Sequence, residues 1–331
     1  MHDSIYRAVV CTELGPPERL ELQRLPRARL GPGSVRVKLR AAGINFPDLL
    51  MIQGKYQHRP ELPFVPGMEA AGLVAETAPD VDAPVTGQEV MVSMRTGGYA
   101  EEAVVPADQV IPLPVGFSFL EGATFLVAHM TAYHALATRA ALAPGQMLLV
   151  LGAGGGVGLA AVQIGKALGG RVIAAASTED KLRIAQKCGA DHLINYEQGP
   201  IDDAVKRLTS GAGVDVVFDP VAIAQESALR CLAYDGKLLV VGFASGAMPA
   251  YAANRILLKG CSVIGIRAGE AGRRNPKMRR QEIETLCALA AQGIVRPLVS
   301  VSYPLHQYAE AMQLLERRQV IGRVALTNDG S

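Results

Sequence analysis

A run of glycines directly after a buried-strand pattern constrains this chain most. Residues 147–151 are apolar, and glycine then occupies positions 152, 154, 155, 156 and 158. Small residues let a chain turn tightly off a strand, let backbone N–H groups approach a pyrophosphate, and let the next helix pack closely on a sheet. Helical spacing follows over residues 157–168, and residues 171–175 are typical of a second strand. The pattern predicts a βαβ unit that binds a dinucleotide, with these residues at the phosphates: Gly154, Gly155, Gly156 and Val157.

The end of the second strand indicates which dinucleotide is preferred. NAD-binding chains usually place Asp or Glu there to accept hydrogen bonds from the ribose hydroxyls. Here the strand ends in alanines followed by Ser177 and Thr178. Ser177 can donate a hydrogen bond to a 2′-phosphate, and Lys181 can supply the opposite charge. We therefore expect NADPH rather than NADH. In the alternative interpretation, Ser177 caps the following helix and Lys181 is a surface residue.

Composition indicates a globular protein of two domains. The chain has 331 residues, of which 49% are hydrophobic and 19% charged. A net charge of +2 predicts no general attraction to nucleic acid or to acidic membranes. One segment, 267–280, is locally basic, and we interpret it as a solvated helix start or the rim of a cleft.

The cysteines and the amino-terminal residues indicate a compartment. Five cysteines lie far apart and form no Cys-x-x-Cys pair, so neither a disulfide framework nor a zinc cluster is predicted. No signal-peptide core or long apolar stretch is present. We expect a cytoplasmic protein without a membrane span.

The hydrophobic pattern changes along the chain. Residues 1–125 alternate short apolar runs with Gly and Pro, which predicts an irregular, mostly β domain. Residues 126–266 contain six apolar runs separated by helical patterns, which predicts a doubly wound parallel sheet. These runs are 148–151, 172–175, 193–195, 214–218, 238–241 and 263–266. Residues 267–331 predict two helices and a strand at 324–326 that returns to the first domain.

Several motifs carry a family resemblance over nearly the whole chain. They include Ala42-Gly43-Ile44-Asn45, Pro66-Gly67-Met68-Glu69, Thr131-Ala132-Tyr133, the glycine turn and Val241-Gly242-Phe243. With these motifs the chain resembles the medium-chain dehydrogenase/reductase superfamily, specifically its zinc-free, zeta-crystallin-like NADPH:quinone oxidoreductase branch. The resemblance implies an α/β fold: a Rossmann doubly wound parallel sheet plus a GroES-like, mostly β catalytic domain.

The zinc ligands of related alcohol dehydrogenases are replaced here. Asn45, Met68 and Val127 stand at the three ligand positions, and an amide, a thioether and an alkyl group do not provide the N/S coordination that zinc requires. The four clustered cysteines of the structural zinc lobe are also missing. His129 and His134 are five residues apart, a spacing that aligns them poorly on a helix. We therefore predict no metal site.

Without a Lewis acid, the hydride acceptor must itself be electrophilic. Quinones and α,β-unsaturated carbonyls meet this need, because conjugation spreads the arriving charge onto an oxygen that a hydrogen-bond donor can stabilise. The sequence thus predicts hydride transfer from C4 of NADPH to a quinone or an enone.

The resemblance also implies individual site residues. Asn45, Tyr56 and Thr131 are expected at the nicotinamide and the acceptor. Alternatively, they are an Asn that stabilises a turn, an aromatic that packs near a loop, and an ordinary helix residue. Leu50 replaces a second family tyrosine of the acceptor pocket. Around the 2′-phosphate it adds two residues to Ser177 and Lys181, namely Tyr196 and Arg318, with Arg317 as an alternative to the latter. Phe243 and Ile266 should flank the nicotinamide. By the resemblance, the strand near residues 261–266 implies a homodimer, whereas an apolar run of this kind is equally typical of an internal strand.

Other functions stay open. The nearest enzymatic alternative is an NADPH-dependent enoyl or alkenal double-bond reductase, whose phosphorylated carrier the basic segment could bind. An alternative of another class is a non-catalytic NADPH-binding or crystallin-like structural protein. Nucleic acid is not expected as the primary partner, because the chain lacks an aromatic-basic RNA motif.

Overall fold

Two compact units make up the chain in the computed structural model, which describes residues 5–223 and 225–328. The first unit takes the residues up to Val127 and those from Pro297 onward, and the second runs from Ala128 to Arg296. The domain boundaries at 125 and 266 stay a prediction about folding domains. Within the described residues, no helix is long and apolar enough to cross a bilayer.

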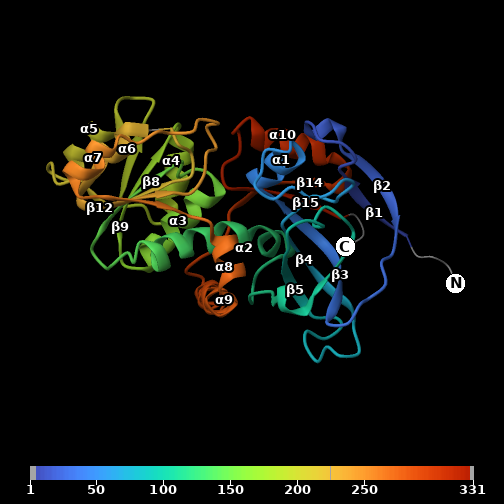
Figure 1. Cartoon of the computed structure of the whole chain (residues 1–331). Coiled ribbons are helices and arrows are strands. Elements are labelled where there is room, and N and C mark those ends of the chain that lie inside the picture. Colours follow the sequence, from blue (N-terminus) through green and yellow to red (C-terminus); the bar gives the residue numbers. More distant parts are fainter. Residues whose placement is uncertain (1–4, 224, 329–331) are drawn as a thin grey trace. The chain divides into compact units, whose positions relative to one another are not determined.

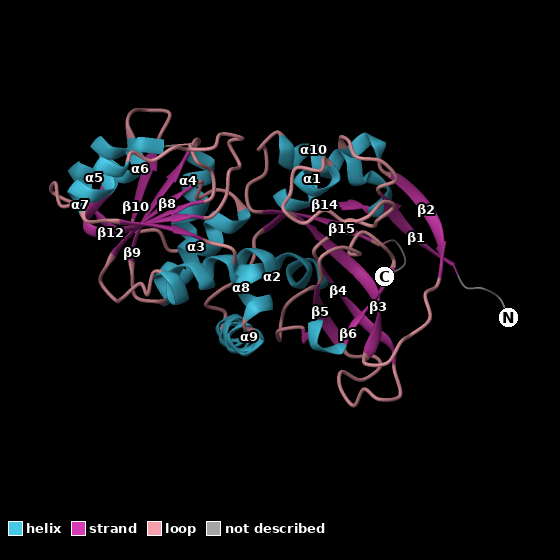
Figure 2. Cartoon of the chain, viewed as in Figure 1, coloured by secondary structure: helices cyan, strands magenta, loops and turns pink. Residues whose placement is uncertain are grey.

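The second unit is built on a six-stranded parallel sheet (Figures 1 and 2). The strand order is β10-β9-β8-β11-β12-β13, so the chain reverses its direction of travel beside the first strand, as in dinucleotide-binding folds. The predicted Rossmann sheet is confirmed, although β12 begins earlier than the predicted Leu238. The bounds are β8 Met147–Leu151, β9 Arg171–Ala176, β10 His192–Asn195, β11 Val214–Asp219, β12 Leu232–Val240 and β13 Ser262–Gly265.

Alternate residues of the strands face helices on opposite sides of this sheet. Leu149 and Ile173 share a core cluster with residues of α5 (Ile201–Leu208) and α6 (Gln225–Cys231). The intervening Leu148 faces α3, where a Cβ on Gly165 would lie 2.6 Å from its side chain. Because side chains alternate along a strand, α3 covers the other face. The remaining bounds are α3 Gly156–Ala167, α4 Glu179–Lys187 and α7 Ala253–Lys259.

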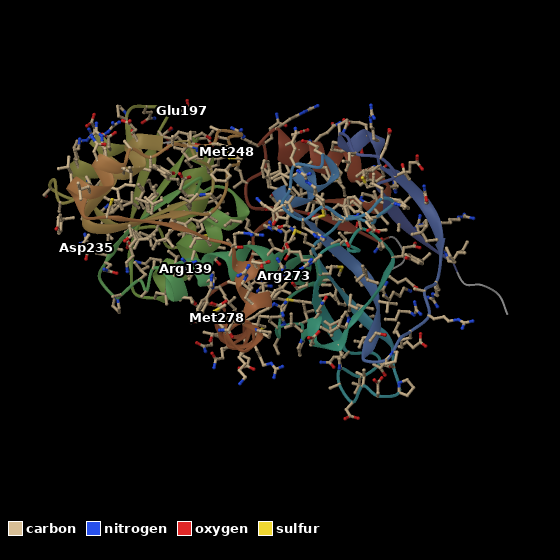
Figure 3. The ribbon with its side chains drawn as sticks, in the orientation of Figure 1. Arg139, Glu197, Asp235, Met248, Arg273 and Met278 are labelled. Carbon is tan, nitrogen blue, oxygen red and sulfur yellow. The ribbon has the colours of Figure 1, made fainter. Side chains whose placement is uncertain are left out.

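Further helices precede and follow the sheet in the chain, and the first of them spans the boundary between the units after Val127. The helix α2 (Phe119–Tyr133) continues into a π-helical turn over His134–Arg139, which the sequence pattern did not predict. The basic segment folds into α8 (Ala268–Arg274) and the start of α9 (Pro276–Ala291), and Figure 3 labels Arg273 and Met278 there. Arg274 and Arg273 bind the Glu270 carboxylate, each at 2.9 Å, and lower the pKa of Glu270 to about 2. The segment is therefore an exposed helical surface.

The first unit contains a seven-stranded sheet in the order β14-β15-β3-β4-β5-β7, with β6 also paired to β3. The strand β15 runs antiparallel to β3, which confirms the predicted return of the 324–326 strand to the first half of the chain. The pair β1–β2 forms a separate ribbon. The bounds are β1 Ile5–Val10, β2 Glu21–Pro26, β3 Ser34–Ile44, β4 Glu69–Thr77, β5 Glu89–Ser93, β6 Glu102–Pro106, β7 Val110–Pro112, β14 Val299–Pro304 and β15 Arg323–Thr327.

Alternate residues of β3 contribute to the core of the first unit. Val35, Val37 and Leu39 on β3 are fully buried, together with residues of β4, β5 and β15. The helices α1 (Phe46–Ile52) and α10 (Tyr308–Glu316) lie entirely within this unit. Asn45 caps α1: the Asp48 carboxylate accepts a hydrogen bond from the Asn45 backbone N–H at 2.9 Å, and the Asn45 side chain accepts one from the Asp48 N–H. This capping box fixes where β3 ends and α1 begins.

Candidate active site

The glycine turn lies at the carboxyl end of β8, where it leads directly into α3. Gly152 has a φ of 61°, which an L side chain rarely adopts, and Gly155 caps α3 with no side-chain hydrogen bond. A Cβ on Gly158 would lie 2.2 Å from the Gly152 carbonyl oxygen. Only glycine therefore allows α3 to approach the turn this closely. The helix presents its first N–H groups and its positive dipole end at the carboxyl edge of the sheet, as an anion site requires.

Lys181 and Ser177 lie beside this turn. The Lys181 stem passes over Gly154 so closely that a Cβ there would lie 2.5 Å from Lys181 Cγ. The Lys181 ammonium donates a hydrogen bond to Ser177 Oγ at 3.3 Å. The side chain that caps α4 is Thr178, which accepts from the Lys181 N–H at 3.3 Å. The alternative in which Ser177 caps the helix is therefore wrong, and its hydroxyl instead stands beside a cation.

The neighbouring strand ends bring one more predicted residue to the same edge. Tyr196 follows β10, and its N–H donates to the carbonyl oxygen of Ala176 at the end of β9. The acid nearest in sequence, Glu179, accepts hydrogen bonds from the side chains of Asn195 at 2.9 Å and Gln198 at 3.5 Å. Its carboxylate is thus already engaged, and no acid ends β9 itself.

The structure distributes the other predicted site residues over both units. Phe243 follows β12, and Ile266 follows β13 with its N–H donated to the Val240 carbonyl, so both stand at the carboxyl edge of the sheet. Thr131 is half-buried on α2 in the second unit, whereas Tyr56 packs against the core of the first. Arg318 also belongs to the first unit, where it follows α10 with a φ of 57°.

Asn45 belongs to a buried polar cluster in the first unit. Its Oδ1 accepts a hydrogen bond from Arg323 Nη2 at 2.9 Å, and its Nδ2 donates to Glu69 Oε1 at 3.1 Å and to the Gly43 carbonyl at 3.4 Å. Arg323 also donates to Glu69 Oε1, and the Val127 N–H donates to Glu69 Oε2 at 2.9 Å. Asn45 is only 2% exposed, so its amide faces into the unit. A donation to an acceptor would have to replace the long contact with Gly43.

Asp48 and Tyr99 complete the cluster, which then contains two buried acids, Asp48 and Glu69. The Tyr99 hydroxyl donates to Asp48 Oδ2 at 2.9 Å, while Asp48 Oδ1 is buried without a partner. Burial raises the pKa of Asp48 to about 7. Burial likewise raises the pKa of Glu69, although Arg323 and the N–H donors oppose this, and it raises the pKa of Tyr99 well above its usual value.

Sequence reasoning missed Glu69, Arg323 and Tyr99 as members of a site. Glu69 opens β4 and Arg323 opens β15, each next to residues that are fully buried. A charged residue at the edge of an apolar strand was the one available signal, because a buried charge needs a partner.

Asp48 should make stability depend on pH. Its pKa is 3.8 in an unfolded chain and about 7 in the fold, so the native state binds the proton more tightly. The stabilisation is fully present below about pH 4 and is lost as pH rises through about 7. The free energy of unfolding of the wild type, compared with that of Asp48→Asn, should fall over this range by roughly 4 kcal/mol at most.

Urea unfolding of both proteins at a series of pH values measures this difference. Glu69, Arg323 and Tyr99 face Asp48 and are the same in both proteins, so their own titration largely cancels. Asp108→Asn, at an exposed position of the same unit, is the matched control and should follow the wild type. A wild-type curve parallel to that of Asp48→Asn would contradict the raised pKa.

The residues at the zinc-ligand positions do not fit that metal. Asn45 is engaged as described, Met68 packs against the apolar core, and Val127 contributes its backbone N–H to Glu69. His129 Nε2 contacts Gln163 at 3.3 Å, and His134 Nδ1 contacts Glu282 at 2.9 Å. Among the described residues, no three His, Cys, Asp or Glu side chains are grouped to hold a metal ion.

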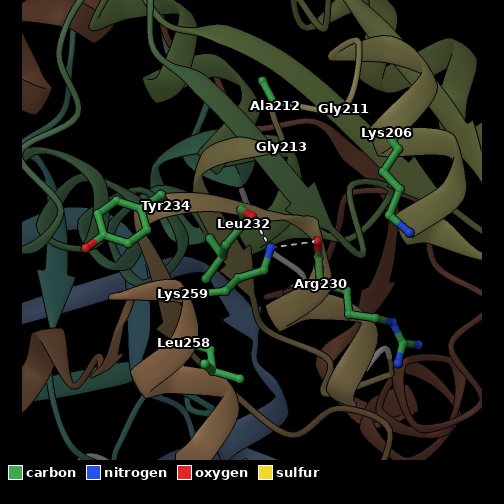
Figure 4. Close-up of a pocket in the computed structure, with 9 residues that line it drawn as sticks. All are labelled: Lys206, Gly211, Ala212, Gly213, Arg230, Leu232, Tyr234, Leu258 and Lys259. Carbon is green, nitrogen blue, oxygen red and sulfur yellow. Dashed lines mark hydrogen bonds between the residues drawn. The ribbon is translucent and has the colours of Figure 1, made fainter.

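A separate pocket of about 310 Å³ lies at the amino ends of strands β11 and β12, opposite to the carboxyl edge that carries the glycine turn (Figure 4). It is lined by Lys206 of α5, the loop before β11, the start of β12 and the ends of α6 and α7. Its cations are already engaged: the Lys259 ammonium donates to the carbonyls of Arg230 and Leu232, and Arg230 binds Asp202 at 2.9 Å. The pocket lies at the amino ends of the strands and is therefore distinct from the glycine turn.

Two family models match the chain. One, described as an alcohol dehydrogenase GroES-like domain, covers residues 31–115, and the other, described as a zinc-binding dehydrogenase, covers residues 156–291. The fold and these matches define a member of the medium-chain dehydrogenase/reductase superfamily, which confirms the resemblance and the fold class expected from the sequence.

Individual relatives narrow the family further. A quinone oxidoreductase-like protein 2 homolog of Nematostella vectensis is 38% identical, over 97% of this chain and 88% of that protein. The crystal structure of Escherichia coli quinone oxidoreductase complexed with NADPH has a TM-score of 0.89 at 29% identity and covers 98% of this chain and 99% of that one. The human synaptic vesicle membrane protein VAT-1 homolog is 31% identical over 97% of this chain and 86% of that protein. The chain thus belongs to the quinone oxidoreductase-like branch of the superfamily.

Proposed function

We propose that this protein is a zinc-independent oxidoreductase that transfers hydride from NADPH to a quinone or a similar conjugated carbonyl. The observation that carries the choice of cofactor is the contact of Lys181 with both Ser177 and Gly154. It provides a cation and a hydroxyl beside a phosphate-binding turn, and β9 ends without an acid. The NADPH complex of the related Escherichia coli enzyme supports this assignment.

The reaction balances with one proton from solvent. Bound NADPH would supply the hydride, and a quinone that receives this hydride together with a proton becomes a hydroquinone. The protein's task is to bind and orient both molecules, to exclude water, and to stabilise the negative charge that develops on the acceptor oxygen. The chain offers amide, hydroxyl and aromatic side chains for this, and its donor set at the zinc positions does not fit a Lewis acid.

We assign the following roles to the predicted residues. Asn45 and Thr131 bind at the nicotinamide, and Asn45 donates to the acceptor oxygen through the hydrogen that contacts Gly43. Tyr56 stacks on the acceptor ring. Phe243 and Ile266 flank the nicotinamide, because both stand at the carboxyl edge of the sheet. Tyr196 and Arg318 complete the 2′-phosphate site.

A parallel assay tests the function. NADPH absorbance is followed with a quinone, an enone and an enoyl thioester after treatment with a chelator. Turnover of the quinone that survives chelation is the expected result. Faster turnover of the thioester would replace the proposal with a double-bond reductase whose carrier meets the basic segment. NADPH binding without oxidation by any acceptor would favour a non-catalytic binding or structural protein.

Neutralising Lys181 should select against NADPH. Lys181→Met keeps an apolar stem over Gly154 and removes the ammonium, so the dissociation constant should rise for NADPH and change little for NADH. A charge-assisted hydrogen bond is worth about 1–3 kcal/mol, which corresponds to a roughly 5- to 150-fold loss of affinity. Fluorescence titration with both cofactors measures the ratio.

Lys187→Met is the matched control for this substitution. Lys187 lies in the last turn of the same helix, α4, and is exposed. It should leave both dissociation constants unchanged. An equal loss of NADPH and NADH affinity in Lys181→Met would contradict the 2′-phosphate assignment.

We also propose a homodimer formed at the edge strand β13. Within the described residues β13 pairs only with β12, and large apolar side chains are exposed nearby, namely Leu257 and Leu258 on α7 and Tyr234 on β12. An open strand edge beside exposed apolar residues is typical of a surface that pairs with another chain.

All five cysteines are unpaired, which supports a cytoplasmic location.

The dimer can be tested by charge. In sedimentation, the wild type should have twice the mass of one chain, whereas Leu257→Asp/Leu258→Asp should shift toward one chain because like charges would meet across a twofold axis. Val115→Asp changes an equally exposed apolar residue in the other unit and should stay dimeric. A monomeric wild type would contradict the proposal.

A further inference from the structure

The orientation of the Asn45 amide is fixed by charged partners. The two ends of an amide have almost the same shape, so hydrogen bonds decide which way it points. Here Oδ1 accepts from Arg323 Nη2, whereas Nδ2 faces two acceptors, Glu69 Oε1 and the Gly43 carbonyl. A flipped amide would place donor against donor at Arg323 and acceptor against acceptor at Glu69. Only one orientation is therefore compatible with the ion pair.

The Glu69–Arg323 ion pair is not explained by stability alone. The side chains are 0% and 7% exposed, so both charges have lost their water. A buried pair of this kind usually stabilises a fold no better than well-packed apolar residues would. Arg323 Nε has no hydrogen-bond partner, so the guanidinium is also not placed to satisfy all of its own donors. The pair does fix the orientation of the Asn45 amide, because Arg323 binds its oxygen and Glu69 binds its nitrogen.

We propose that Glu69 and Arg323 are positioning residues for the acceptor step, and that they act by holding the Asn45 amide with a single hydrogen available to the acceptor. The hydrogen bonded to Glu69 is held at 3.1 Å by a carboxylate, whereas the other makes a longer contact of 3.4 Å with the neutral Gly43 carbonyl. This second hydrogen can give up its contact with the Gly43 carbonyl and bind an acceptor oxygen instead. The kinetic part of this inference rests on the proposed function.

A cycle of variants separates positioning from a merely structural role. Glu69→Gln/Arg323→Met removes both charges together and so leaves no buried charge unpaired. With Asn45 present, it should lower kcat for the quinone by roughly tenfold. The NADPH dissociation constant should change no more than in Asn45→Ala, because the glycine turn lies in the other unit and the pair acts on the cofactor only through Asn45. In an Asn45→Ala background, the same double change should have little further effect on kcat. An equal fall in both backgrounds would overturn the proposal.

A second measurement does not depend on turnover. In protein labelled with ¹⁵N-asparagine, the Asn45 side-chain signals, identified by their loss in Asn45→Ala, should exchange with solvent slowly in the wild type. Exchange should be roughly tenfold faster or more in Glu69→Gln/Arg323→Met. Asn328 is an internal control, since its amide donates to the backbone carbonyls of Leu39 and Ala100 and should not change.

The two measurements distinguish the possible failures. Unchanged exchange at Asn45 would overturn the inference whatever the activity. Faster exchange in a protein that reduces no quinone, or whose Asn45→Ala variant is fully active, would support the positioning of the amide and reject the proposed function of Asn45.

Discussion

Nucleotide binding will be almost abolished in Gly158→Ala. The added Cβ would lie 2.2 Å from the Gly152 carbonyl oxygen and 2.9 Å from the Ala153 Cα, and both are backbone atoms that cannot rotate away. The first turn of α3 must therefore move off the glycine turn, and its N–H groups would no longer point at a common phosphate position. We expect the NADPH dissociation constant to rise about 100-fold or more, equivalent to about 2.7 kcal/mol, in a calorimetric titration.

A matched glycine separates this effect from the general cost of the substitution. Gly269 lies in α8 of the same unit, where an added Cβ would meet only the end of the Arg273 side chain at 3.5 Å. Gly269→Ala should bind NADPH as the wild type does and should be slightly more stable, since alanine favours a helix. If folded Gly158→Ala bound NADPH with unchanged affinity, this turn would not be the pyrophosphate site.

Removing Arg323 alone should strongly destabilise the first unit. Arg323→Met leaves the fully buried Glu69 without its cation, and breaking a buried pair in this way typically costs about 3–5 kcal/mol. Part of the cost should be relieved by protonation of Glu69, whose pKa is already raised by burial. The urea midpoint should therefore fall steeply, and the fall should be largest at high pH.

We also expect that removing the Glu69 charge as well restores part of the stability that is lost in Arg323→Met. Glu69→Gln/Arg323→Met should be more stable than Arg323→Met, because no uncompensated charge remains. Arg7→Met is the control for loss of a partly exposed arginine, since the Arg7–Glu101 pair is 38% and 29% exposed and should contribute about 1 kcal/mol or less. A double variant as unstable as the sum of its parts would show that the two charges do not compensate each other.

Local patterns were enough to predict the Rossmann sheet. Its strands β8, β9 and β11 are buried on both faces, so each appears in the sequence as a short apolar run, and the glycine turn marks where the first run meets a helix. The start of β12 was predicted too late because residues 233–237 include polar positions and Asp235 has a φ of 62°, which an apolar pattern does not reveal. The π-helical turn at His134–Arg139 was missed because helical spacing does not distinguish it from an α-helix.

The candidate site could be predicted only where its members are close in sequence. Ser177 and Lys181 are four residues apart, and a strand followed by a helix brings them together. Glu69 and Arg323 are 254 residues apart, and nothing in either local pattern names the other as its partner. The alternative interpretation gave the helix cap to Ser177, but Thr178 is the cap. Two adjacent hydroxyl residues are equivalent in a propensity argument, and only the backbone geometry separates them.

The distance between Glu69 and Arg323 along the chain has a consequence for biosynthesis. A ribosome makes β3, β4 and Glu69 long before it makes Arg323, which neutralises Glu69. Until then, burial of the Glu69 carboxylate in the amino-terminal region has a high cost in free energy. That region can bury the Glu69 carboxylate against its cation only after β15 has been translated and added beside β3. The sheet of the second unit comes from one uninterrupted stretch of chain, so the second unit can fold before the first unit is complete.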